Sequence, residues 1–188
     1  TCNDSKIPTN EENLIVRAAK VLQEKFSINK GAKIYLEKKI PSPGGLGGGS
    51  SDCAVAILGF LKLWGLKIKL SELIEIGTEL GSDVPFFFFG GTALGTGRGT
   101  EIYEIEDIEE EYILLISPNI SVSTPSAFAK INAPRLTNLS SKSILKICFD
   151  EAEKLQSKQE VPINDFESTI FEIEPEIKCV KEKLLSCG

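Results

Sequence analysis

The sequence predicts an α+β fold, in which helices and strands mix without the regular alternation of a doubly wound parallel sheet. Two observations lead to this class. Apolar residues recur at helical spacing in several segments, whereas other segments alternate between polar and apolar residues or run apolar for a few positions. The chain has 188 residues, of which 41% are hydrophobic, so it can bury the core of one large domain or two small ones.

The elements of the first half are assigned from periodicity and turn residues. Helices are expected over residues 12–25, from Ser50 or Ser51 onward, and over a segment that Ser71 can cap. Strands are expected over 32–40, where side chains alternate, over the four phenylalanines 86–89, and over 92–96 and 101–105.

The second half is expected to hold a strand and further helices. The strand is expected over 112–117, a helix is expected to start at Thr124-Pro125, and further helices are expected within 141–157 and 165–186. The acidic connector from Glu106 to Glu111 is the best candidate for a domain boundary. It divides the chain into residues 1–107 and residues 108–188.

The composition argues against several classes of partner. A net charge of −6 gives no general attraction to nucleic acid or to an anionic membrane, so local donors have to hold any anionic ligand. The five cysteines form no CxxC pair and the chain has no histidine, which argues against a zinc set and for free, mostly buried thiols. No apolar run reaches the length of a membrane span, and no signal-peptide pattern opens the sequence.

Residues 41–52, PSPGGLGGGSSD, join the strand expected over 32–40 to the next helix. At such a junction, the free N–H groups of the first helical turn and the positive end of the helix dipole favour an anion. Glycines let the backbone approach phosphate oxygens closely, and Ser50 and Ser51 add hydroxyl donors. The stretch matches neither GxxxxGK[ST] nor GxGxxG, and a flexible linker is the alternative. We interpret it as a phosphate-binding loop.

Asp83 lies between a helix end and an apolar run, in Leu80-Gly81-Ser82-Asp83-Val84-Pro85-Phe86. The residues alone allow two interpretations. Asp83 is either a turn residue that bonds its own backbone or a general base in a partly desolvated pocket. The glycine cluster 90–99 that follows is typical of hairpin turns.

PxxxGLGGGSSD at the start of a helix resembles the second signature of the GHMP small-molecule kinases, P-x-x-x-G-L-G-S-S-A-A. Gly-Gly-Gly-Ser-Ser, where the signature has a single glycine before its serines, points to the branch that acts on a cytidine diphosphate sugar alcohol. The other segments that look like this branch are spread over nearly the whole chain, at residues 13–19, 38–41, 81–99, 123–125 and 164–167.

The resemblance implies a two-lobed fold, with a first lobe like the second domain of ribosomal protein S5 and a ferredoxin-like second lobe. It implies ATP-dependent phosphorylation of the 2-hydroxyl of 4-(cytidine 5'-diphospho)-2-C-methyl-D-erythritol, in non-mevalonate isoprenoid precursor synthesis, with Mg²⁺ as cofactor. The implied partners are this small molecule and ATP, without nucleic acid or membrane. The protein would be a monomer or homodimer in a bacterial cytoplasm or a plastid stroma.

The same resemblance implies the site residues. Asp83 matches the base that faces the substrate hydroxyl, and Thr124 and Phe128 match positions at the cytidine end of the substrate. Asn13 and Lys38 match positions that the family uses around the adenine of ATP. The other positions implied for ATP are Pro41, Gly44, Gly45, Leu46, Gly47, Gly48, Gly49, Ser50 and Ser51, and Ser51 is also the candidate Mg²⁺ ligand. Taken without the resemblance, Asn13 is equally typical of a helix cap, Lys38 of a solvated strand face and Phe128 of a core.

Two motifs of the family have no counterpart here. The first carries a catalytic lysine with aromatic and histidine residues, and the third is a Ser-Gly-Ser-Gly turn. Because both would lie at the ends, we expect both lobes to be truncated and this chain alone to be catalytically incomplete. The alternatives are a GHMP kinase for homoserine or mevalonate, a non-catalytic nucleotide-binding module, and a purely structural domain.

Overall fold

The computed structural model describes residues 1–41, 44–109, 112–118, 120, 122, 127, 129–131, 140–157 and 163–187. Backbone contacts divide the chain into two units, Thr1–Ile108 and Glu109–Gly188, which are treated separately below. Helices predominate in both units and the first also holds a two-stranded sheet, so the predicted α+β class is confirmed. None of the helices in the described ranges is long and apolar enough to cross a membrane.

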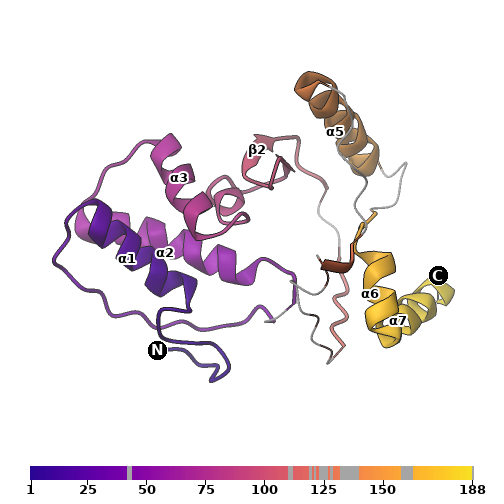
Figure 1. Ribbon diagram of the computed structural model, residues 1–188, viewed down its shortest axis with the longest axis horizontal. Helices are drawn as coiled ribbons and strands as arrows, with labels where there is room; N and C mark the ends of the chain where they lie inside the picture. Colours follow the sequence, from indigo (N-terminus) through magenta and orange to yellow (C-terminus); the bar gives the residue numbers. More distant parts are fainter. Residues whose placement is uncertain are drawn as a thin grey trace. The chain divides into compact units, whose positions relative to one another are not determined.

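The core of the first unit lies among three helices, α1 (Leu14–Lys25), α2 (Gly48–Trp64) and α3 (Leu70–Leu80). Figure 1 shows α1 running alongside α2, with which it shares its main contacts. Each helix buries an aliphatic side chain almost completely, and these are Leu22, Ile57 and Ile76. Burying such a side chain stabilises the fold by about 1.5–3 kcal/mol. The core therefore fixes the direction of α2, whose first turn carries the glycine run.

Local sequence explains where α1 and α2 begin and end. α1 begins after Asn13, whose side-chain oxygen accepts a hydrogen bond from the backbone N–H of Ile15 at 2.9 Å. α2 begins after Gly47 and ends before Gly65, and both glycines have positive φ values, of 66° and 70°. A side chain at either position would be strained, which explains why glycine stands there.

Ser71 does not cap α3, so this prediction is wrong. The N-cap residue is Lys69, and Ser71 is already the second residue of the helix. The first intrahelical bond runs from the backbone N–H of Leu73 to the carbonyl of Lys69 at 3.0 Å. The helix therefore starts too early for the Ser71 hydroxyl to occupy the capping position.

The four phenylalanines 86–89 do not form the predicted strand. Pro85–Phe88 is a 3-10 helix, η1, in contact with α2 and α3. Phe87 packs against the start of α2 and Phe88 packs against α3. Periodicity cannot distinguish a strand from a helical turn in so short an apolar run. The proline, which is favoured in the first turn of a helix, is the signal that the strand prediction overlooked.

The segment 32–40 keeps the predicted alternation but pairs very little. Ile34, Leu36 and Lys38 are half-buried, whereas the residues between them are exposed. The bridge recorded for this segment among the described residues is the parallel pair of Cys2 and Leu36. The predicted strand is therefore reduced to a single bridge, although its inward face is as predicted.

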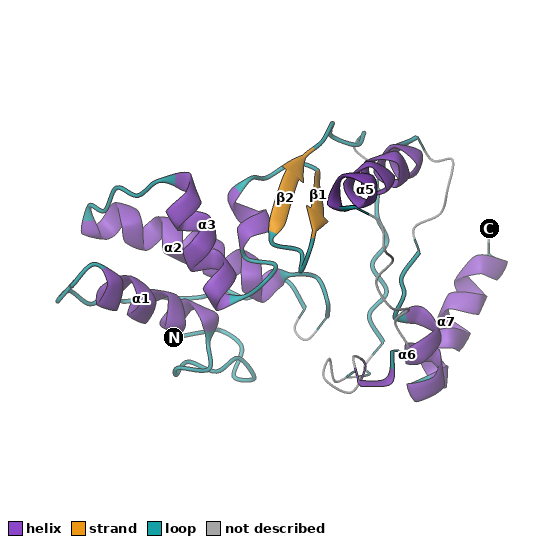
Figure 2. Cartoon of the chain, turned by 45° about the horizontal axis from the view of Figure 1, so that its top comes forward, coloured by secondary structure: helices purple, strands orange, loops and turns teal. Residues whose placement is uncertain are grey.

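The glycine cluster 90–99 contributes to the predicted β-hairpin. β1 (Ala93–Thr96) pairs with β2 (Glu101–Glu104) in an antiparallel register that joins Ala93 to Glu104 and Thr96 to Glu101 (Figure 2). Gly97 and Gly99 in the turn have φ values of 65° and 84°. These positive values explain the glycines of the turn and confirm the hairpin interpretation.

The described helices of the second unit lie within the predicted ranges and are α5 (Ser141–Gln156), α6 (Glu167–Ile173) and α7 (Pro175–Ser186). The hydroxyl of Ser140 caps α5 by accepting from the backbone N–H of Ser143 at 3.2 Å, and α6 packs on α7. Residues 112–117 form no strand, contrary to prediction, because no described segment pairs with them. The predicted helix start at Thr124-Pro125 lies outside the described residues.

Candidate functional site

The glycine run forms the entry to α2. Gly45 and Gly47 have positive φ values of 64° and 66°, and the first intrahelical bond runs from the N–H of Ser51 to the carbonyl of Gly47 at 2.8 Å. The N–H groups before Ser51 have no acceptor within the helix. No side chain of the described residues caps this end, and the first turn carries no acidic residue. The entry to α2 therefore offers unpaired donors and a positive dipole end to an anion.

Three consecutive glycines in this run have three different surroundings. A Cβ at Gly47 would lie 2.7 Å from Cζ of Phe87. A Cβ at Gly48 would lie 2.9 Å from the ammonium nitrogen of Lys38. A Cβ at Gly49 would meet no protein atom within 4 Å. Packing thus requires glycine at the first two positions, whereas Gly49 opens onto free space.

One pocket, of about 200 Å³, lies at this free space. Its polar lining comes from Glu12, Asn13, Lys38 and Asp52, and Gly49 forms part of its wall. The structure thus brings together Asn13 and Lys38, two residues for which the resemblance implied a place at the nucleotide. Asn13 is at the same time the cap of α1, and its amide N–H donates to the carbonyl of Pro8 at 2.7 Å.

Lys38 and Asp52 form an ion pair in this pocket, with Nζ and Oδ2 2.5 Å apart. The side chain of Lys38 is 5% exposed and that of Asp52 is 24% exposed. The solvated strand face considered for Lys38 is therefore wrong, because Lys38 shares the inward face of its segment with Ile34 and Leu36. Asp52 was not among the predicted site residues, although a lone carboxylate near the start of an apolar helix was a usable signal.

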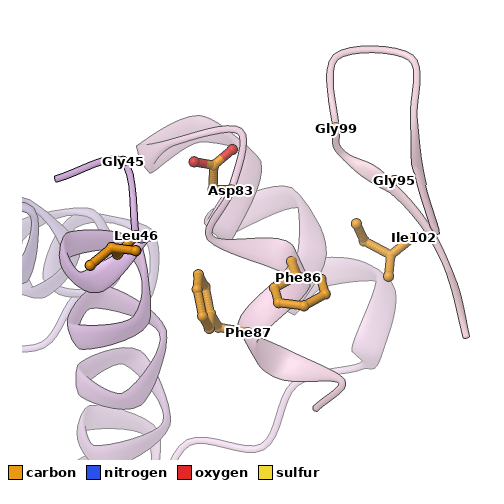
Figure 3. Close-up of a pocket in the computed structure, with 9 residues that line it drawn as sticks. Gly45, Leu46, Asp83, Phe86, Phe87, Gly95, Gly99 and Ile102 are labelled. Atoms are coloured by element: carbon orange, nitrogen blue, oxygen red, sulfur yellow. The ribbon is translucent and has the colours of Figure 1, made fainter. Parts of the chain in front are cut away.

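A second pocket, of about 310 Å³, lies on another side of the glycine turn (Figure 3). Its residues come from the glycine turn, from the segment of Asp83 and η1, and from the hairpin, and are Gly45, Leu46, Gly47, Asp83, Phe86, Phe87, Gly95, Gly99 and Ile102. Figure 3 shows the Asp83 carboxylate above the apolar side chains of Leu46 and Phe87. The glycine loop and the carboxylate thus line one cavity.

Asp83 is held by a tight turn after α3. The backbone N–H of Val84 donates to the carbonyl of Gly81 at 3.1 Å, and the Val84 side chain is fully buried. Asp83 itself is exposed, so the expectation of a partly desolvated carboxylate is not met in this structure. Asp83 thus lies in a turn and lines a pocket, and its role as a general base stays a prediction.

The remaining predicted site residues are placed as follows. Pro41 precedes the loop, and its carbonyl oxygen would lie 3.1 Å from a Cβ at Gly44. Ser50 and Ser51 are half-buried in the first turn of α2. Thr124 and Phe128 lie outside the described residues. In the ranges that the structure describes, no group of three or more acidic, cysteine or histidine side chains could hold a metal ion.

The first part of the chain is similar to a known family. Residues 13–91 match the family described as GHMP kinases N terminal domain. This region contains α1, the glycine loop, α2, α3 and Asp83, and it makes up less than half of the chain.

Nearly the whole chain is similar to 4-diphosphocytidyl-2-C-methyl-D-erythritol kinases. It is 37% identical over 186 residues to the enzyme of that name from Enterococcus faecalis, covering 99% of this chain and 65% of the relative. It is 36% identical over 182 residues to the enzyme from Bacillus cereus, covering 97% and 62%. A crystal structure of 4-(cytidine 5'-diphospho)-2C-methyl-D-erythritol kinase matches with a TM-score of 0.66 and 30% identity, covering 95% of this chain and 63% of the other. The chain thus spans slightly less than two thirds of the length of these relatives.

Proposed function

We propose that this protein is an ATP-dependent kinase that phosphorylates the 2-hydroxyl of 4-(cytidine 5'-diphospho)-2-C-methyl-D-erythritol. The observation that carries the proposal is that the glycine turn at the start of α2 lines two pockets, one with Asn13 and Lys38 and one with Asp83. A triphosphate held at this turn could have its nucleoside in the first pocket and its γ-phosphate near the second. The similarity of nearly the whole chain to the kinases named above supports the choice of substrate.

The proposed roles follow the two pockets. The backbone from Gly44 to Ser51, together with Pro41 and Leu46, surrounds the phosphates, and the nucleoside lies by Asn13 and Lys38. Asp83 takes the proton of the substrate hydroxyl. Thr124 and Phe128 are proposed at the cytidine end. In this scheme residues 1–107 carry the ATP site, and residues 108–188 contribute on the substrate side.

The proposed reaction is an in-line displacement. The oxygen of the 2-hydroxyl forms a bond to the γ-phosphorus, and its proton passes to the Asp83 carboxylate. The bond between the γ-phosphorus and the β,γ-bridging oxygen breaks, and ADP leaves with that oxygen. The amides at the entry to α2 stabilise the charge that develops on the phosphate oxygens.

Mg²⁺ is part of this proposal, and the donors present at the site fit it. Mg²⁺ usually keeps several waters and binds through substrate phosphates together with one or two protein oxygens, so an acidic cage is not required. The Ser51 hydroxyl, in the first turn of α2, is the proposed protein ligand. The ion would neutralise charge on the β- and γ-phosphates when bound.

The test compares Asp83→Asn with Glu79→Gln in the full-length protein. Glu79 is an exposed carboxylate on α3 that lines neither pocket, so it is a matched control. We expect Asp83→Asn to lower kcat by about 10²- to 10⁴-fold, as the loss of a positioned base does. The KM for ATP should change little, because Asp83 does not line the nucleotide pocket.

The same assay includes homoserine and mevalonate as acceptors. Turnover of either one in preference to the cytidyl substrate would replace the proposed substrate. ATP binding without transfer to any of the three acceptors would indicate a non-catalytic nucleotide-binding module. Wild-type turnover in the Asp83→Asn variant would remove Asp83 from the mechanism.

A further inference from the structure

Lys38 is held at both its backbone and its side chain. Its backbone N–H donates to the side-chain oxygen of Asn3 at 2.7 Å, and its carbonyl accepts from the side-chain N–H of the same residue at 3.4 Å. Its ammonium donates to Asp52 in the pair described above. An ammonium has three donors and this bond uses one of them. Because the backbone of Lys38 is bonded to Asn3, its ammonium is the group with donors to offer a ligand.

The position of this ammonium is unusual for a cation. It lies beside Gly48, the first residue of α2, where a Cβ would come within 2.9 Å of the nitrogen. A positive charge at the N-terminus of a helix is unfavourable, because the helix dipole and the free N–H groups are positive there. The nearly buried side chain has little water to offset this repulsion. Asp52, one turn into the same helix, supplies the compensating charge.

We propose that Asp52 is a positioning residue, which holds the Lys38 ammonium at the entry to α2. Although the nucleoside lies in the same pocket, the ammonium then donates to the phosphate tail of the nucleotide rather than to its base. The proposal rests on the proposed function for the identity of the ligand. An anion at the entry to α2 would interact with the helix amides and the ammonium together. Without the carboxylate, the ammonium would be repelled from that position.

The position of the Lys38 ammonium favours the phosphate tail, rather than the base, as its hydrogen-bond acceptor. Gly48 is the first residue of the turn with free amides, and the ammonium lies on the side of Gly48 to which a Cβ would point. Gly49, the next residue, forms the wall of the pocket that Lys38 and Asp52 also line. A ligand phosphate in this corner would therefore meet backbone amides and the ammonium at once.

The experiment measures the binding of adenosine, ADP and ATP to the full-length protein by calorimetry. For Lys38→Met we expect ADP and ATP to bind about 10- to 100-fold more weakly, as the loss of one charge-assisted hydrogen bond does, while adenosine binds as to the wild type. Asp52→Asn should also weaken the binding of ADP and ATP but not of adenosine. The loss of affinity should be smaller than for Lys38→Met, because the lysine remains but is no longer held. Loss of adenosine binding equal to that of ATP would overturn the proposal.

A double variant controls for misfolding of the single variants and tests whether Lys38 and Asp52 act together on ATP binding. Lys38→Met with Asp52→Asn removes both charges, so neither is left buried alone. We expect its ATP affinity to be no weaker than that of Lys38→Met, since Asp52 acts only through Lys38. Additive losses would contradict a positioning role. The controls are Lys25→Met and Glu72→Gln. They break an ion pair whose Nζ and Oε1 atoms are 3.2 Å apart and whose residues line neither pocket, so all three affinities should stay unchanged.

Exchanging the two charges separates positioning from structure. In Lys38→Asp with Asp52→Lys an ion pair can re-form, but it brings a carboxylate to the entry of α2. We expect thermal stability to recover relative to the single variants while ATP affinity stays low. Full recovery of ATP affinity would mean that the pair is only structural. Binding decides this inference and turnover decides the proposed kinase function, so the two can fail separately.

Discussion

Gly49 differs from the glycines before it because a Cβ there would meet no protein atom within 4 Å. We predict that Gly49→Ala stabilises the protein without nucleotide by about 0.5–1 kcal/mol, since alanine is the better helix former. It should also weaken ATP binding, because the added methyl group would occupy the space of a phosphate. Urea unfolding and calorimetry measure the two effects.

Gly59 is the matched control for this prediction, because it also lies in α2 and a Cβ there would also meet nothing within 4 Å. Gly59 lines neither pocket. Gly59→Ala should therefore give a similar gain in stability with unchanged ATP affinity. Equal ATP affinity in both variants would indicate that no phosphate approaches Gly49.

Cys53 couples stability to alkaline pH. Its side chain is fully buried in α2, and burial raises the pKa of the thiol from its ordinary value to about 12. Above pH 9 the unfolded chain loses this proton while the folded chain keeps it, so the free energy of unfolding falls as the pH rises towards 12. Urea midpoints at pH 8 and pH 10 should therefore fall less in Cys53→Ala than in the wild type. Equal falls of the urea midpoint in the wild type and in Cys53→Ala would show that other groups cause the loss of stability at alkaline pH.

The role of Asn13 as the cap of α1 can be tested separately from its role in the pocket that it lines. Asn13 both accepts from Ile15 and lines the pocket with Lys38. Asn13→Ala should lower the free energy of unfolding by about 0.5–2 kcal/mol, whereas Asn13→Ser should restore most of it, because serine also caps helices. A fall in ATP affinity common to both variants would assign the amide to the nucleotide. Recovery of the affinity in the serine variant would limit Asn13 to the cap.

At the scale of elements, η1 links the glycine loop to the segment that carries Asp83. Phe87 packs so closely on Gly47 that a Cβ would come within 2.7 Å of its ring, and Phe88 packs as closely on Gly77 of α3. The two aromatic rings thus join the start of α2 to α3. The predicted strand would not explain these contacts, because they depend on the tight turn of a 3-10 helix.

At the scale of the whole chain, the segment after β2 lies between the two units. Residues 106–109 are exposed and lie outside every helix and strand, and the boundary between the units falls at Ile108 and Glu109. We predict that a glutamate-specific protease cleaves first at Glu109, because an exposed segment without secondary structure fits a protease site. Mass spectrometry of early digests identifies the cut. A first cut within α1, α2 or α3 would contradict the prediction.

Particular residues show how much the sequence could predict. The phosphate-binding interpretation of residues 41–52 needed only local information, because the glycines, the serines and the helix start are neighbours in the chain. The resemblance implied that Asp83 faces the substrate hydroxyl, but the spacing of the residues could not predict that Asp83 and Gly47 line one pocket. Asp52 was missed, because its partner Lys38 lies in a different segment and no periodicity links the two.

The sequence by itself determined the helices, the hairpin and the entry to α2, because these depend on patterns of neighbouring residues. Only the tertiary structure decided which atoms the three glycines face, that η1 replaces a strand, and that Lys38 turns inward to Asp52. These outcomes depend on packing between segments far apart in the chain, where close contact and the cost of burying an unpaired charge select the arrangement.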